Sequence, residues 1–138
     1  SVLQGGDADN NPTFKCFGYK SEGKPYFAAY MNGKTTAVGT ITSPVIGGGI
    51  AKLNFKYAIP FSETKGVKFK VEILQGGSVV KSFTVDKSDA AKLTAYDYSV
   101  DVDVDGEFQI VFTNLSPSAA SDKNKDRYAI WNVNWTQK

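Results

Sequence analysis

Oxygen-bearing side chains recur at alternate positions in a polar loop near the end of the chain. Asp122, Asn124 and Asp126 are separated by single lysines. Carboxylate and amide oxygens are the ligands that calcium prefers, so this loop is a candidate calcium site. The interleaved lysines would repel a cation, and a solvated turn is therefore the favoured interpretation. No other cofactor is expected.

A second acidic motif precedes a glycine. Residues 101–106 read DVDVDG, which matches the start of an EF-hand loop, but Phe112 stands where that loop needs a bidentate glutamate. The intervening valines fit a β-strand better than a calcium loop. We interpret the aspartates as a solvated strand face that meets lysines on neighbouring strands, such as Lys68 or Lys70.

Tyrosines and tryptophans offer a different chemistry, because exposed aromatic rings provide rigid contact area at little entropic cost. Tyr19, Tyr26 and Tyr30 lie near predicted loops and are candidates for ligand binding. Trp131 and Trp135 have the same parity, so we expect them to share one face of their strand. The other face is apolar too, at Tyr128 and Ile130, which favours a strand buried on both sides and tryptophans in the core.

The single arginine of the chain, Arg127, starts the same strand. Its guanidinium suits a carboxylate, and a structural pair with Asp126 or with an aspartate on a neighbouring strand is favoured over contact with a ligand. The candidate ligand-binding set is Tyr19, Tyr26, Tyr30, Asn124, Arg127 and Trp131.

The composition excludes several classes of function. With no histidine and one cysteine, Cys16, the chain lacks a histidine base, a Cys-His nucleophile and the usual zinc ligand sets. Glycoside hydrolysis needs two placed carboxylates, and no such pair stands out, so we do not expect an enzyme. A net charge of +2 with dispersed lysines argues against nucleic acid. No apolar run approaches ~20 residues, so no membrane span is expected.

The elements that must position these residues are short strands with a period of two. One face of each strand is apolar and the other is polar, as in a sandwich of two sheets. Gly76-Gly77 and Asp105-Gly106 each predict a tight hairpin. The chain is interpreted as one domain, 1–138, with a loosely held entry segment at 1–13. We expect strands at 14–19, 26–31, 36–42, 50–59, 67–75, 78–85, 95–104, 107–114 and 127–136.

Four segments resemble the jelly-roll modules of secreted and surface proteins of Bacteroides-type bacteria, the choice-of-anchor or MAM-like, carbohydrate-binding-module-like sandwiches. They are 39–46 (GTITSPVI), 48–57 (GGIAKLNFKY), 106–114 (GEFQIVFTN) and 125–135 (KDRYAIWNVNW). The resemblance implies an exported, non-catalytic module whose role is binding a glycan or a surface ligand. It supplies no catalytic residue and no mapped ligand site.

Together these observations predict an all-β fold, a two-sheet antiparallel jelly-roll-like sandwich of about eight or nine strands. The expected function is secreted recognition of a glycan or cell-surface ligand, outside the cell, on its surface or in the periplasm. The alternative is a scaffolding module of a larger exported protein that binds no small ligand. Expected partners are a polysaccharide or neighbouring domains, and we expect a monomer.

Overall fold

A computed structural model gives the fold of the chain. It describes the backbone of residues 2–3, 16–21, 24–31, 33–34, 37–38, 40–59, 66–91, 94–115 and 128–138, and side chains within 40–59, 66–91, 94–115 and 128–138. The described elements are β1 (Val2–Leu3), β2 (Cys16–Ser21), β3 (Lys24–Met31), β4 (Gly33–Lys34), β5 (Ala37–Val38), β6 (Thr40–Thr42), β7 (Ile50–Ala58), β8 (Val67–Gln75), β9 (Ser78–Lys87), β10 (Tyr96–Val104), β11 (Gln109–Asn114) and β12 (Tyr128–Thr136).

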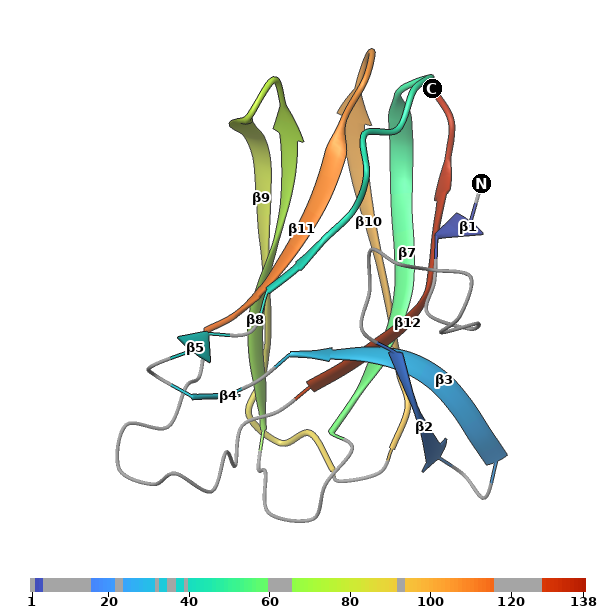
Figure 1. The fold of residues 1–138 in the computed structure, drawn as a ribbon, viewed down its shortest axis with the longest axis vertical. Helices are drawn as coiled ribbons and strands as arrows, with labels where there is room; N and C mark the ends of the chain where they lie inside the picture. Colours follow the sequence, from blue (N-terminus) through green and yellow to red (C-terminus); the bar gives the residue numbers. More distant parts are fainter. Residues whose placement is uncertain are drawn as a thin grey trace.

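Two antiparallel sheets form a β-sandwich, as predicted (Figure 1). The first sheet has the order β10-β7-β12-β3-β2, with β1 paired to β12, and the second has the order β6-β11-β8-β9. β4 and β5 make a separate two-stranded ribbon. β12, the strand with both tryptophans, lies in the middle of the first sheet. Within the described ranges, no helix is long and apolar enough to cross a membrane.

The alternation of apolar and polar residues explains which face of each strand is buried. In β7 and β8, side chains two residues apart enter the core, while those between them are more exposed. The buried positions are Leu53, Phe55 and Tyr57 on β7, and Val67, Phe69, Val71 and Ile73 on β8.

Aromatic rings join the two sheets. Phe69 of the second sheet packs edge-on against Tyr57 of the first, with 5.5 Å between ring centroids, and lies 6.0 Å from Tyr128. Phe112 packs edge-on against Phe55 at 5.2 Å. Edge-to-face pairs of this kind add about 0.5–1.5 kcal/mol each beyond the area they bury. The core between the sheets is therefore largely aromatic at its centre.

One of the two predicted hairpins is present. Gly76 and Gly77 have φ values of +58° and +82° and connect β8 to β9, as a type I′ turn requires. The hairpin predicted at Asp105-Gly106 is wrong, because β10 pairs with β7 in one sheet while β11 pairs with β6 and β8 in the other. This turn instead carries the chain from one sheet to the other, near the C-terminus at the top of Figure 1.

Both neighbours of β7 contain one extra residue relative to it. The register shifts between Asp101 and Val104 in β10, and between Trp131 and Asn134 in β12. A left-handed residue lies within each shift: Asp103 at φ +59° and Asn132 at φ +54°. Asparagine and aspartate adopt this conformation more readily than other side chains. Each shift is a β-bulge. In β12 it reverses the inward–outward alternation of the residues that follow, whereas in β10 the even-numbered residues face the core on both sides of the shift.

The bulge in β12 corrects the prediction that Trp131 and Trp135 share a face. Trp135 joins the core between the sheets with Val133, whereas Trp131 lies on the opposite face with Ala129. Both tryptophans are buried, at 4% and 7% exposed. The prediction that they are buried side chains is thus confirmed, although the parity argument behind their shared face was wrong.

The entry segment predicted at 1–13 falls mostly outside the described residues. Val2 and Leu3 form β1 and pair with Asn134 and Val133 of β12. The two predicted strands 14–19 and 26–31 correspond to β2 and β3, which pair with one another.

Candidate functional site

The outer face of the first sheet, which points away from the core, carries the polar positions of three adjacent strands. β7 lies between β10 and β12. Ser99 of β10 and Asn134 of β12 are both register partners of Asn54 on β7. Because directly opposed residues in an antiparallel pair project to the same side, the three side chains form a row across the strands.

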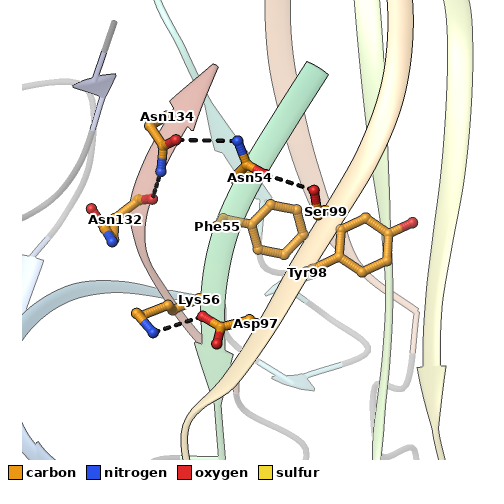
Figure 2. Close-up of a pocket in the computed structure, with 8 residues that line it drawn as sticks. All are labelled: Asn54, Phe55, Lys56, Asp97, Tyr98, Ser99, Asn132 and Asn134. Atoms are coloured by element: carbon orange, nitrogen blue, oxygen red, sulfur yellow. Dashed lines mark hydrogen bonds and ion pairs between the residues drawn. The ribbon is translucent and has the colours of Figure 1, made fainter. Parts of the chain in front are cut away.

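This row lies in a hollow of about 200 Å³, shown in Figure 2. Two of its lining residues, Phe55 and Tyr98, pack their rings together, 5.0 Å apart, as part of the core. The remaining lining residues are polar, and we call this set the amide groove: Asn54, Lys56, Asp97, Ser99, Asn132 and Asn134.

A chain of hydrogen bonds crosses the groove from β10 to β12 (Figure 2). The Ser99 hydroxyl donates to Asn54 Oδ1 at 2.7 Å, and Asn54 Nδ2 donates to Asn134 Oδ1 at 3.2 Å. Asn134 Nδ2 then donates to the backbone carbonyl of Asn132 at 2.8 Å. We call this series the relay. It holds two amide side chains in fixed orientations before any ligand arrives.

The bulge at Asn132 brings Asn134 opposite Asn54, where it can join the relay. Trp131 is opposite Lys56, and without the extra residue Val133 would be opposite Asn54. With it, Val133 turns into the core and Asn134 takes the position on the polar face. The same irregularity therefore places one apolar side chain inside and one amide outside.

Where β7 and β10 lie side by side, their lysines and aspartates occur as opposed pairs. Lys56 Nζ contacts Asp97 Oδ1 at 2.6 Å, with the two side chains 35% and 81% exposed. Lys52 and Asp101 are register partners on the same two strands. Exposed ion pairs contribute only about 0–1 kcal/mol to stability, so their main effect here is to neutralise the lysines. These aspartates meet β7, not Lys68 or Lys70, which lie on β8 in the other sheet.

The remaining aspartates of residues 101–106 also have partners. Lys138 Nζ contacts Asp103 at 2.6 Å and Asp105 at 3.1 Å. The hydrogen bond from Lys138, and then its charge, lower the pKa of Asp103 below the ordinary value of 3.8. Among the described residues, no group of three or more His, Cys, Asp or Glu side chains could hold a metal.

Several residues predicted from the sequence to bind a ligand or calcium cannot be placed. Asp122, Asn124, Asp126 and Arg127 lie outside the described residues. Tyr19, Tyr26 and Tyr30 lie on β2 and β3, where only the backbone is described. Tyr19 is opposite Tyr26 in the register, and Tyr30 is opposite Ala129.

Trp131 is the one predicted ligand-binding residue with a described side chain. It is buried with Ala58 and Ala129 and offers almost no accessible ring surface. A sugar cannot stack on such a ring, so we remove Trp131 from the ligand-binding set. Every other aromatic ring in the described part of the chain is also buried or half-buried.

The three residues of the relay were missed at the level of sequence. Asn54, Ser99 and Asn134 stand at polar positions of alternating strands, which is the pattern of any solvated face. Only the order β10-β7-β12 brings them together. The one available signal was the repeated Asn in an otherwise apolar strand, at Asn132 and Asn134.

A second, smaller hollow lies at the end of the sandwich near the β8–β9 turn. It measures about 140 Å³ and is lined by Val45, Leu74, Gly76, Glu107, Phe108 and Gln109. Val45 is among the most exposed apolar side chains of the described residues. This hollow holds no hydrogen-bonded amides comparable to the relay.

Comparison with known proteins identifies the fold but not a family. No protein-family model matches the chain, and no curated protein matches it in sequence. Among solved structures, a family 6 carbohydrate-binding module superposes with a TM-score of 0.57 at 13% identity, over 100% of this chain and 94% of that one. A family 6 module from Clostridium stercorarium, in complex with cellobiose, gives 0.54 at 16% identity, over 100% and 94%.

A longer protein also contains this architecture. A family 43 arabinoxylan arabinofuranohydrolase from Bacillus subtilis, in complex with cellotetraose, matches with a TM-score of 0.59 at 16% identity; the alignment covers 100% of this chain but 27% of that enzyme. At such identities the likeness shows the fold alone. The chain has an all-β sandwich fold similar to that of carbohydrate-binding modules.

Proposed function

We propose that the protein is a non-catalytic recognition module that binds a glycan in the amide groove. The observation that carries this proposal is the relay, a row of oriented amide and hydroxyl groups in a hollow of about 200 Å³ on a sheet face. Sugars are ligands rich in hydroxyl groups, and convergent polar groups in a concave site give orientation and specificity. The fold shared with carbohydrate-binding modules supports the same function.

Recognition in this groove would rest on hydrogen bonds rather than on aromatic stacking. No exposed aromatic ring lies among the described side chains, so the stacking expected from the sequence has no support there. The same observation favours the alternative of a scaffolding module in a larger exported protein. Export to the cell surface, periplasm or medium of a Bacteroides-type bacterium and a monomeric state are further parts of the proposal. For Asp122, Asn124 and Asp126 a solvated turn remains favoured over a calcium site.

Affinity electrophoresis tests the function directly. Native gels would contain neutral polysaccharides (hydroxyethylcellulose, xylan, galactan or β-1,3-glucan) or charged ones (polygalacturonate or alginate). We expect retardation of the wild-type protein by at least one polysaccharide. Asn54→Ala removes the centre of the relay and should weaken that binding roughly tenfold, since a net hydrogen bond contributes about 0.5–1.5 kcal/mol and more than one is lost.

A substitution in the second hollow is the control for where on the protein the glycan binds. Val45→Ala should leave the retardation unchanged, because Val45 lies outside the amide groove. Loss of binding in Val45→Ala, with normal binding in Asn54→Ala, would move the site to the end of the sandwich. If no polysaccharide in the panel retards the wild-type protein, the scaffolding alternative is favoured.

A further inference from the structure

The direction of the relay can be deduced from one fixed acceptor. A backbone carbonyl can only accept a hydrogen bond, so the Asn134 group that faces the Asn132 carbonyl must be its amino group. Asn134 Oδ1 then faces Asn54, which must present its own amino group in return. Asn54 Oδ1 therefore faces Ser99, and the Ser99 hydroxyl must donate. No amide in the row can turn over without opposing two acceptors.

The fixed direction determines what each group can still offer. Ser99 has committed its only proton to Asn54, so Oγ can accept a hydrogen bond from a ligand but not donate one. Asn54 and Asn134 each use one amino hydrogen within the relay and keep a second. Since strands are spaced about 4.8 Å apart, the acceptor on β10 and the donor on β12 are about 10 Å apart.

We propose that the relay sets the specificity of the groove: it selects an uncharged ligand that donates a hydroxyl proton at Ser99 and presents oxygen lone pairs to Asn54 and Asn134. This inference rests on the proposed function and adds the order of donors and acceptors that a glycan must match. The ligand would lie across the strands, with a length of about two sugar units between the two ends of the relay.

The requirement for an uncharged ligand follows from the ion pair beside the relay. Among the residues with described side chains, Lys56 is the one cation that lines the groove, and Asp97 contacts it at 2.6 Å. A carboxylated or sulfated sugar would gain little from the paired lysine and would approach the exposed Asp97 carboxylate. Binding should therefore depend weakly on salt, unlike binding to a basic surface.

The backbone of the bulge holds this order in place. Asn132 lies in the left-handed region, and its carbonyl is the last acceptor of the relay. We assign this residue a positioning role: the carbonyl acts on Asn134, which in turn orients Asn54.

The test compares Ser99→Ala with Ser82→Ala, the same change on β9 of the opposite sheet. Both serines are exposed, so both variants should fold, although Ser99→Ala also gives up the hydrogen bond to Asn54; melting curves check that both are folded. Binding is measured by affinity electrophoresis with the neutral and charged polysaccharides named above, and with methylcellulose, whose methyl ethers accept hydrogen bonds but cannot donate them. Ser99→Ala should weaken binding of the retained neutral polysaccharide about five- to tenfold, as expected for one lost hydrogen bond. Ser82→Ala should bind as the wild type does.

The possible outcomes distinguish a failure of this inference from a failure of the proposed function, glycan binding in the amide groove. Three results would support the inference. Ser99→Ala weakens binding while Ser82→Ala does not. Polygalacturonate and alginate retain the wild-type protein only weakly, and methylcellulose retains it less than hydroxyethylcellulose does. Retention of a neutral polysaccharide that Ser99→Ala leaves unchanged would overturn the inference while the proposed function stands. Preferential binding of the charged polysaccharides would overturn it as well. If nothing retains the wild-type protein, both proposals fail together.

Discussion

At the scale of single residues, the polar face of the first sheet is organised by pairing. The amides and hydroxyl of the relay are oriented by one another, and Lys52 and Lys56 of β7 are each opposite an aspartate of β10. Buried or half-buried polar groups in such networks are costly to leave unsatisfied, which keeps their orientations narrow. Preorganisation of this kind lets a hydrogen-bonded ligand bind without the further cost of ordering the site.

Asp103 should make stability depend on pH in the acid range. Lys138 lowers its folded-state pKa below 3.8, so its contribution to stability is present at neutral pH and is lost as pH falls from about 3.8 through that lowered pKa. Asp103→Asn keeps a residue that tolerates φ +59° and removes the charge. The melting temperature of the variant should be slightly below wild type at pH 7 and equal to it at the lowest pH.

A matched variant isolates this effect. Lys138→Gln removes the partner of Asp103, and in that background Asp103→Asn should no longer lower the melting temperature at pH 7. High salt should reduce the difference between Asp103→Asn and wild type at pH 7, since exposed charges are screened. A difference that persists unchanged at low pH would contradict the role of the Lys138 contact.

At the scale of elements, the β-bulge in β12 is the feature on which both core and site depend. It sends Val133 and Trp135 into the core while Asn134 joins the polar face. Left-handed backbone costs an ordinary L-residue roughly 1–2 kcal/mol, and asparagine is among the residues that bear it best. The identity of residue 132 should therefore affect stability through the backbone.

Substitutions at Asn132 test this account of the bulge. Asn132→Gly should be as stable as wild type or up to about 1 kcal/mol more stable, because glycine adopts positive φ freely. Asn132→Val should lose about 1–2 kcal/mol, because a β-branched residue is strained there. Urea unfolding measures both. Asn132→Gly keeps the carbonyl and should retain glycan binding; a loss of binding would mean that the Asn132 side chain, not its backbone, acts in the groove.

The sequence predicted where the strands lie in the chain far better than it predicted which strands pair with one another. The period of two located strands such as 67–75 and 95–104 to within a residue of β8 and β10. It could not tell which strands pair, so the Asp105-Gly106 turn was taken for a hairpin and the aspartates of β10 were assigned lysines in the wrong sheet. It also could not show the extra residue in β12, because a bulge is defined by register against a partner strand. Predicting the amide groove would have required both the strand pairing and the position of the bulge in β12.

At the scale of the whole molecule, the two sheets are held together by a shared aromatic core. Phe69 is fully buried and contacts rings from both sheets, including Tyr57 and Phe112. The chain has a single cysteine, so no disulfide within it can assist this packing. The relay lies on the far side of one sheet from this core, which gives it a rigid support.

Truncation of Phe69 tests how much this aromatic core contributes to the free energy of unfolding. Phe69→Ala should lower the free energy of unfolding by about 3–5 kcal/mol, the usual cost of removing a buried phenylalanine. Phe83→Ala on the edge strand β9 is the matched control, and its cost should be smaller because Phe83 is half-buried. Equal losses in the two variants would contradict a core centred on Phe69.

The central claim is that the amide groove is the glycan site, and NMR mapping tests it most directly. A ¹⁵N-labelled protein would be titrated with the soluble polysaccharide that retards it in affinity electrophoresis, following backbone and side-chain amide signals. We predict the largest shifts at Asn54, Ser99 and Asn134, including the side-chain amides of both asparagines. Shifts centred on Val45 and Gln109, or on residues remote from β7, β10 and β12, would contradict the claim.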